Sequence, residues 1–415
     1  MSPTAPIAID RLPASHFQPL ELASEALRQN AMNGMLAEWA LQKPFYATRN
    51  GLPVAVVARA RDVREVLNDA ARFTVIAPPF PEYKVFDLFG GLESVLQMDG
   101  ERHARVRRLM APAFMPTGVR ELEASIDAII EEKLARIAQL DTHFDVMEHF
   151  SRDIIMRVLL DASFKLTAEQ QQVFSRMHQS MALATEFEAD QPLPQEFLES
   201  IVAVRNVIDA IVAERRENPG DDMISQLVMA RDEGRGLNDE ELFGQINSIC
   251  AAGLGTTAAT IGSAIYVLAK HPEQLKLLQS EPALIDSAVE ECLRFHGPGI
   301  HTFTRFAAHD TEIGGVPILK DMPVIASMQA ASYDPDEFAE PLRFDIRRNP
   351  RGVLAFGSGP HFCIGNRLAR LIMRKAIGGL ITRFPALRLA DENFTPVYCG
   401  FPGELCLATL PMRTT

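Results

Sequence analysis

The strongest constraint on the fold is a stretch of 28 consecutive residues, 242–269, that contains no charged side chain. Its length alone would allow it to cross a bilayer. It also holds four glycines and seven Ser, Thr, Asn or Gln side chains, which make it more polar than a typical membrane-spanning helix. We therefore expect a long helix buried in the centre of a globular protein, with Asp239 as its N-cap and His271-Pro272 at its end.

Helical periodicity dominates the rest of the chain. Apolar residues recur at three- and four-residue spacing over residues 119–140, 146–160, 196–217 and 367–383. Strand-like runs are fewer, at residues 53–60 and 312–330, and the Pro-rich stretch 187–197 reads as a loop between two helices. The pattern predicts a mainly α protein with a small β portion, in which disorder is confined to about the first twelve residues.

Charge and the N-terminal sequence limit the classes of partner. Acidic residues outnumber basic ones by 54 to 41, and the formal net charge is −13. This charge repels a phosphate backbone or an anionic bilayer, so nucleic acid is not an expected partner. The first residues lack the basic patch and apolar run of a secretory signal, so we expect a cytoplasmic protein without a membrane anchor.

Only one of the five cysteines stands among glycines: Cys363 in FGSGPHFCIG, residues 356–365. The odd number and wide spacing of the cysteines argue against a disulfide framework. A helix is expected to begin near Ile364, and its N-terminus would stabilise a thiolate, which is a nucleophile or a metal ligand. The alternatives are a buried structural cysteine and a nucleophile with His361 as its base, and local chemistry alone does not separate them.

The same ten residues resemble the haem-binding loop F-x-x-G-x-H-x-C-x-G of the cytochrome P-450 family. The matching positions are Phe356, Gly359, His361, Cys363 and Gly365. The resemblance implies a single cytochrome P-450 domain over residues 1–415, with haem b between the long central helix and the cysteine loop. Cys363 would be the axial thiolate ligand of the iron. Phe356, Gly357 and Gly365 would lie against the haem.

Two further patterns of the family concern charged residues. Glu291 and Arg294 form the helical Glu-x-x-Arg, and Arg343 in PLRF would complete a buried charged triad beneath the haem. The resemblance also implies cationic contacts to the two haem propionates, which need such partners once they leave water. These contacts would come from four side chains: His103, Arg107, Arg305 and His361.

The segment AAGLGTT, residues 251–257, resembles the family's oxygen-binding signature A/G-G-x-D/E-T-T/S. Ala252 and Gly253 would leave room for the haem and dioxygen, and the Thr256 hydroxyl would take part in proton delivery. Gly255 departs from the pattern, because the family has an acid at this position. Its absence makes a peroxide-driven or atypical haem-thiolate enzyme the main alternative, and a non-enzymatic haem carrier or sensor a further one.

The resemblance implies that electrons come from a partner, because the chain has no room for a flavin or iron–sulfur domain. Eight basic residues and one acid lie between Arg343 and Lys375, which suggests a docking face for an acidic ferredoxin that works with a reductase. We expect Arg370 and Arg374 to be exposed on the cysteine side.

The substrate pocket would be lined by residues 80–98, 250–252 and 298–303 and by the turn around Phe401, which are mostly apolar. Tyr83, His301 and Thr302 are candidate polar anchors, each as readily satisfied within the protein. Together these features predict a haem-thiolate monooxygenase that inserts one oxygen atom of O2 into a small or medium hydrophobic substrate.

Overall fold

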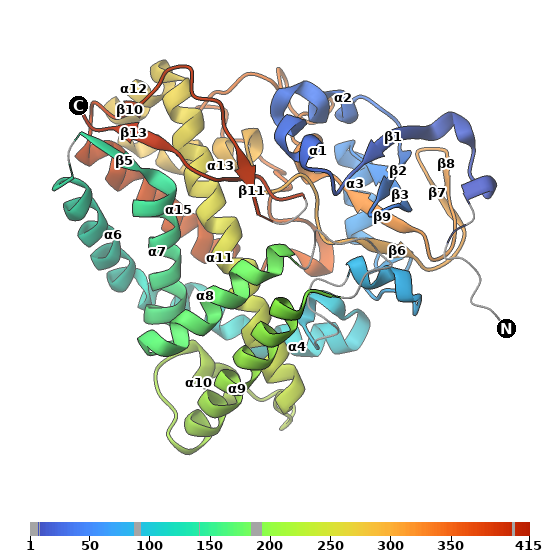
Figure 1. Cartoon of the computed structure of the whole chain (residues 1–415), viewed down its shortest axis with the longest axis horizontal. Coiled ribbons are helices and arrows are strands. Elements are labelled where there is room, and N and C mark those ends of the chain that lie inside the picture. The colour runs from blue at the N-terminus through green and yellow to red at the C-terminus, as the bar shows by residue number, and fades with distance from the viewer. Residues whose placement is uncertain (1–6, 8, 87–92, 141, 184–192, 401–402) are drawn as a thin grey trace.

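The computed structural model describes residues 7, 9–86, 93–140, 142–183, 193–400 and 403–415. Helices occupy most of this part of the chain, and Figure 1 shows most of them on one side of the molecule, with the main sheet and helices α1, α2 and α3 on the other. The α-helices are α1 Glu25–Asn30, α2 Leu36–Ala40, α3 Ala60–Asn68, α4 Gly100–Phe114, α5 Pro116–Glu121, α6 Glu123–Ile137, α7 Arg152–Met156, α8 Ala168–Leu183, α9 Gln195–Glu217, α10 Met223–Met229, α11 Asp239–Lys270, α12 Pro272–Ser280, α13 Ile285–Phe295, α14 Met328–Ala331 and α15 Asn366–Arg383.

The strands are short. They are β1 Phe17–Glu21, β2 Phe45–Arg49, β3 Leu52–Val57, β4 Phe73–Thr74, β5 His143–Asp145, β6 Arg305–Ala307, β7 Thr311–Ile313, β8 Val316–Ile318, β9 Pro323–Ala326, β10 Arg388–Leu389, β11 Tyr398–Cys399, β12 Cys406–Leu407 and β13 Pro411–Arg413. Within the described residues, six of them form the main sheet in the order β1-β2-β3-β9-β6-β4. The others form a three-stranded sheet, β10-β13-β5, and the pairs β7-β8 and β11-β12. The expected mainly α fold with a small β portion is confirmed.

Two predictions about individual segments need correction or fall outside the described residues. Residues 9–11 form a short 3-10 turn and Leu12 is buried against the main sheet, so the expected disorder of the first twelve residues is wrong for these four. The predicted loop at 187–197 lies mostly outside the described residues, and α9 already begins at Gln195.

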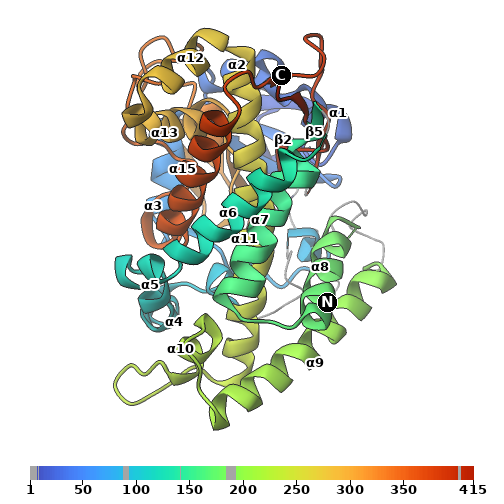
Figure 2. The same ribbon diagram turned by 90° about the vertical axis from the view of Figure 1, so that its left-hand side faces the viewer.

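Helix α11 is the long central helix that the uncharged stretch predicts. Figure 2 shows it running through the middle of the helical region, between α15 and the layer formed by α7 and α8. In the described part of the chain it is the one helix long and apolar enough to cross a membrane, and 72% of that apolar window is buried inside the protein. The expected buried helix is therefore confirmed.

The ends of α11 show which residues define it. Its N-cap is Asn238 instead of the predicted Asp239, because the Asn238 side chain accepts from the backbone N–H of Glu241 and the Glu241 carboxylate accepts from Asn238. This reciprocal arrangement is a capping box. The helix ends at Lys270, and its C-cap is His271, immediately before Pro272, as expected.

Polar side chains of α11 hold neighbouring segments against it. The Gln245 amide accepts from the backbone N–H of Val95 at 2.8 Å and donates to the carbonyl of Glu93 at 2.6 Å. A Cβ built at Gly244 would lie 2.3 Å from that same carbonyl oxygen, so only glycine lets the two backbones approach this closely. The polar residues of the uncharged stretch therefore attach the segment before α4 to the central helix.

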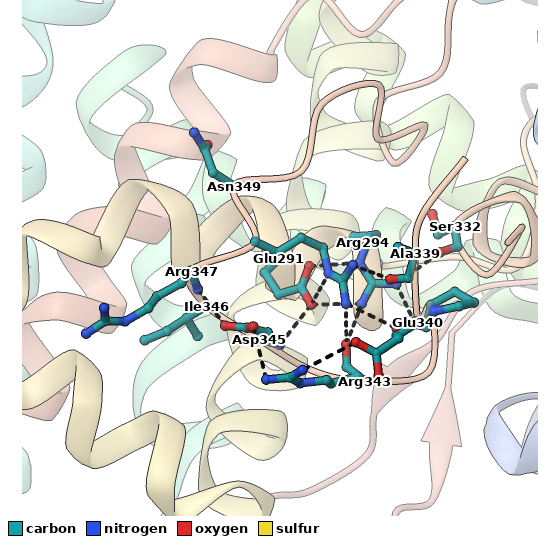
Figure 3. Close-up of polar contacts among 12 residues, drawn as sticks. Glu291, Arg294, Ser332, Ala339, Glu340, Arg343, Asp345, Ile346, Arg347 and Asn349 are labelled. Atoms are coloured by element: carbon teal, nitrogen blue, oxygen red, sulfur yellow. Dashed lines mark hydrogen bonds and ion pairs between the residues drawn. The ribbon is translucent and has the colours of Figure 1, made fainter. Parts of the chain in front are cut away.

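A buried charged network joins α13 to the loop before the cysteine. Glu291 and Arg294 are fully buried and form two hydrogen bonds of 2.8 Å each, and Figure 3 shows the two side chains facing one another. The remaining Arg294 donors reach the carbonyls of Ser332, Pro341 and Arg343. Every polar group of this ion pair therefore has partners, as burial of charge requires.

The second arginine of the network is Arg348, and the prediction of Arg343 is wrong. Arg348 Nε lies 3.2 Å from Glu291 Oε1, and its other nitrogens donate to three carbonyls of the same loop. The Arg343 side chain is 60% exposed and pairs with Glu340 and Asp345 (Figure 3). Arg343 contributes its carbonyl oxygen to the network, and its charge remains at the surface.

We expect Arg348→Ala to lower the free energy of unfolding by about 1–3 kcal/mol, because a charge-assisted hydrogen bond to buried Glu291 is lost. Arg343→Ala is the matched control and is expected to change stability by no more than about 0.5 kcal/mol. Urea unfolding of both variants measures the difference. A larger loss for Arg343→Ala than for Arg348→Ala would contradict the assignment.

Candidate functional site

The cysteine loop is held in a fixed conformation by its own backbone. The N–H of Cys363 donates to the carbonyl of Phe356 at 2.9 Å, and the N–H of Gly357 donates to that of Leu354 at 2.7 Å. Gly357 and Gly359 have φ of +73° and +70°, a region that favours glycine. A Cβ at Gly359 would meet the carbonyl oxygen of Leu67 at 2.4 Å, so the loop also fits closely against the end of α3.

Cys363 stands at the start of α15, which begins at Asn366, two residues later than expected, with Gly365 as its N-cap. Burial raises the pKa of the Cys363 thiol. The backbone N–H groups of Gly365 and Asn366 and the charges of Arg107 and Arg370 oppose this rise. The sulfur is therefore placed where donors favour a thiolate, while burial leaves it poorly suited to act as a free nucleophile.

His361 does not serve as a base for Cys363. Its Nε2 lies 3.0 Å from Asp99 Oδ1, and Asp99 also accepts from the Thr74 hydroxyl and the backbone N–H of Val75. These hydrogen bonds lower the pKa of Asp99, although its burial acts in the opposite direction. A cysteine hydrolase built on these two residues therefore has no support in the structure.

The four residues expected at the haem propionates lie on three different elements. His103 and Arg107 lie on α4, Arg305 begins β6, and His361 belongs to the cysteine loop. The rings of His103 and His361 are 4.3 Å apart between centroids, and Arg107 donates to the carbonyl of Phe362. The structure thus brings His103, Arg107 and His361 together beside the cysteine loop. Arg305 acts electrostatically on His103, His361 and Asp99.

This cluster has a shortage of acceptors that an anionic group would relieve. His103 is buried and its Nε2 has no hydrogen-bond partner in the described structure. Its pKa is lowered to about 4 by burial and by the neighbouring His361 and Arg107. Burial also lowers the pKa of Arg305 to about 10. Carboxylates placed here would pair with these donors, so the residues present fit a haem with two propionates.

Asp99 is the residue of this site that sequence reasoning missed. It is a carboxylate within the cationic cluster and contacts the Nε2 of His361. The available signal was its position immediately before Gly100, the first residue of the helix that carries His103 and Arg107.

The segment expected to bind dioxygen, residues 251–257, lies in helix α11. Thr256 is exposed although Gly255 and Ala258 are buried, and its hydroxyl donates to the carbonyl of Ala252 at 2.7 Å. Ala252 is half-buried, and a Cβ at Gly253 would lie 3.1 Å from a methyl group of Leu159. The hydroxyl is thus held at the helix surface by a bond to its own preceding turn.

The candidate substrate anchors differ in how far the protein already satisfies them. The Tyr83 hydroxyl donates to the carbonyl of Asp321, and the Thr302 hydroxyl donates to that of Phe303. His301 Nδ1 lies 2.9 Å from the carbonyl of Thr302, but its Nε2 has no partner in the described structure. Phe401 and residues 87–92 of the expected pocket lie outside the described residues.

The expected docking cations are largely paired. Arg370 is wrong as an exposed residue, because its side chain is only 29% exposed, pairs with Glu290 and covers the ring of Phe356. The Arg374 side chain is 40% exposed and pairs with Asp286. The other basic residues of the segment with acidic partners are Arg343, Arg347, Arg348 and Lys375.

Comparison with known proteins identifies the family. The chain matches the family "Cytochrome P450" over residues 41–411 and belongs to it. Epothilone C/D epoxidase of Sorangium cellulosum is 33% identical over 348 residues, which cover 82% of this chain and 79% of that protein. 6-Deoxyerythronolide B hydroxylase of Saccharopolyspora erythraea is 34% identical over 298 residues, 71% of each chain.

A solved structure extends the likeness to the fold. The myxobacterial cytochrome P450 CYP267B1 in complex with myristic acid has a TM-score of 0.84 and 27% identity, and the match covers 95% of this chain and 98% of that one. The resemblance drawn from the cysteine loop is therefore confirmed. The chain is a haem-iron oxidoreductase of the monooxygenase type, which incorporates one atom of O2.

We expect Arg107→Ala to speed the loss of haem about tenfold, because removing one charge-assisted hydrogen bond to a propionate costs about 1.5–3 kcal/mol. Transfer of haem to an apo-globin acceptor, followed by absorption, measures this rate. Arg108→Ala is the matched control, since Arg108 is its exposed neighbour on α4 and pairs with Asp232. Equal rates for the two variants would contradict the propionate contact.

Proposed function

We propose that this protein is a ferredoxin-dependent haem b monooxygenase that acts on an extended apolar substrate bearing a carboxylate, such as an acyl chain. When bound, haem would supply O2 activation, and the Cys363 thiolate would hold its iron. Phe356, Gly357 and Gly365 would lie against the haem, and His103, Arg107, Arg305 and His361 would hold its propionates. The observation that carries this proposal is the fixed cysteine loop beside a cationic cluster in which the buried Nε2 of His103 has no partner among the described residues.

The remaining residues of the site have simple roles. Ala252 and Gly253 present little side-chain volume on α11, so a flat group and a small gas molecule fit beside the helix. The Thr256 hydroxyl, held by the carbonyl of Ala252, is placed to pass on a proton. Asp99 orients His361. We also propose that residues 1–415 act as one domain and that the protein works in the cytoplasm.

Two buried nitrogens support a carboxylate-bearing substrate. Arg49 is 4% exposed, its Nε has no hydrogen-bond partner in the described structure, and burial lowers its pKa to about 10. The charge of Arg49 and burial together lower the pKa of His301 to about 4, and its Nε2 also lacks a partner. An anionic head group would satisfy both, while apolar side chains such as Phe86 contact the rest of the molecule.

Myristic acid, the ligand of one structural neighbour, is the first compound to test. With NADH, a ferredoxin and its reductase under 18O2, we expect a hydroxylated product that carries one 18O atom. We expect Arg49→Met to weaken myristic acid binding about tenfold or more, because a charged hydrogen bond is lost. Methyl myristate is the matched neutral ligand and should bind the unmodified protein and the Arg49→Met variant with equal affinity.

Absorption titration of the haem measures both affinities. Failure of myristic acid to perturb the haem spectrum would contradict the acyl substrate, and equal loss of affinity for the acid and the ester would contradict the carboxylate contact. Product without 18O would contradict the monooxygenase reaction itself.

The ferredoxin would dock on the face behind the cysteine loop. A surface depression there is lined by Arg64, Arg351, Gly357, Phe362 and Arg370, among others. Arg351 and Arg367 are exposed and form no ion pair within the described part of the chain, so they replace Arg370 and Arg374 as the leading docking cations. Phe362 is 36% exposed and adds an apolar contact near the sulfur.

We expect the double variant Arg351→Glu/Arg367→Glu to be reduced by ferredoxin about tenfold more slowly at low ionic strength, because electrostatic steering is reversed. Stopped-flow reduction under carbon monoxide measures this rate. Arg235→Glu reverses one exposed charge, half the change made by the double variant, and serves as the control. An unchanged rate for the double variant at low salt would contradict the docking face.

A further inference from the structure

The position on α11 where the family has an acid is already in contact with an acid from elsewhere. Gly255 is buried, and a Cβ built on it would lie 2.8 Å from Oε1 of Glu404. The same Cβ would lie 3.2 Å from Cε1 and 3.6 Å from Nε2 of His178 on α8. A carboxylate and an imidazole therefore converge on one point of the helix, directly before Thr256.

The chain holds Glu404 at this point by several contacts. Glu404 is 8% exposed, forms a β-bridge with Gly299 and precedes β12. Gly400 has φ +102°, and a Cβ built on it would lie only 2.2 Å from Glu404 Oε2. A larger residue at position 400 would therefore collide with the carboxylate. The carboxylate is thus built into the hairpin that lies against α11.

Charged groups of the described structure act on both members of the pair. Burial and the charge of Arg152 lower the pKa of His178. Arg152 donates to the carbonyls of Leu407 and Ala408, and the charge of Glu404 acts on the Cys406 thiol. His178 is half-buried, so part of the residue remains accessible to solvent.

We propose that Glu404, assisted by His178, relays protons to the Thr256 side of α11 in place of the acid that Gly255 lacks. The inference rests on the proposed ferredoxin-driven reaction, which consumes one substrate molecule, one O2, two electrons and two protons and yields one hydroxylated product and one water. In the relay, the O–H bond of the Glu404 carboxylic acid breaks and its proton passes to the Thr256 side of α11. The resulting carboxylate regains a proton from the His178 imidazolium, and the neutral imidazole then takes a proton from solvent. No electrons move in this relay.

Substrate-free consumption of NADH, with a ferredoxin and its reductase, tests the relay without a known substrate. We expect Glu404→Ala and Glu404→Gln to lower this rate about tenfold or more, as loss of a general acid does, with a larger solvent deuterium isotope effect. Reduction of the haem under carbon monoxide needs no such proton, so its rate should not change. Glu392→Gln, an exposed acid in the same C-terminal region, is the control.

Placing an acid at position 255 of the helix provides a rescue experiment for the Glu404 variants. Gly255→Asp alone places a second carboxylate against Glu404, so we expect it to lower the rate. The double variant Gly255→Asp/Glu404→Ala returns the acid to the helix and should recover most of the rate lost in Glu404→Ala. Such non-additivity shows that the two positions share one role.

A measurement independent of activity tests the contact itself. In the reduced, carbon monoxide-bound holoenzyme, NMR titration of labelled histidine should show a lower pKa for His178 in Glu404→Gln than in the unmodified protein, because a carboxylate that favours the imidazolium is gone. An unchanged pKa for His178, or unchanged NADH consumption in both Glu404 variants, would overturn the proposal. If ferredoxin failed to reduce the haem of the unmodified protein, the proposed function would be overturned instead.

Discussion

The site depends on one constraint, the placement of the Cys363 sulfur at the N-terminus of α15. Glycine turns and the hydrogen bond from the Cys363 N–H to the carbonyl of Phe356 fix that position before any ligand binds. Burial opposes ionisation of the thiol, and a bound metal ion reverses this because a coordinated thiol is deprotonated. Under the proposed function, Cys363 therefore serves as a ligand for iron and not as a reactive cysteine.

Other elements of the structure contribute the remaining groups of the site. Helix α4, strand β6 and the cysteine loop contribute the cations. The Glu291–Arg294–Arg348 network holds the loop that precedes the cysteine, and Thr256 lies on α11 with its hydroxyl held by the carbonyl of Ala252. Glu291 and Arg294 are buried and only the edge of Arg348 is exposed, so the network fixes the position of the loop. The C-terminal hairpin then adds Glu404 to α11 at the position where the family's usual acid is absent.

The features that could be predicted from the sequence are those that a single continuous segment of the chain determines. The uncharged stretch predicted α11, and the spacing of five residues around Cys363 predicted the haem loop and the family. The Asn238 cap was also within reach, since Glu241 stands three residues later, as a capping box requires. The prediction of Asp239 as N-cap did not take the pairing of Asn238 with Glu241 into account.

The errors concern contacts between segments far apart in the sequence. Arg343 and Arg348 are equivalent as charges, and only the path of the loop decides which one reaches Glu291. Arg370 pairs with Glu290 because α15 packs on α13, which no local pattern reveals. The contact between Gly255 and Glu404 likewise depends on how the hairpin folds back onto α11.

The most direct test of the central claim is the absorption spectrum of the reduced, carbon monoxide-bound protein, compared with that of Cys363→His. The account predicts the long-wavelength Soret band of thiolate-ligated haem in the unmodified protein and its displacement to shorter wavelength in the variant. The same long-wavelength band in both proteins would show that Cys363 is not the iron ligand, and the account would be contradicted.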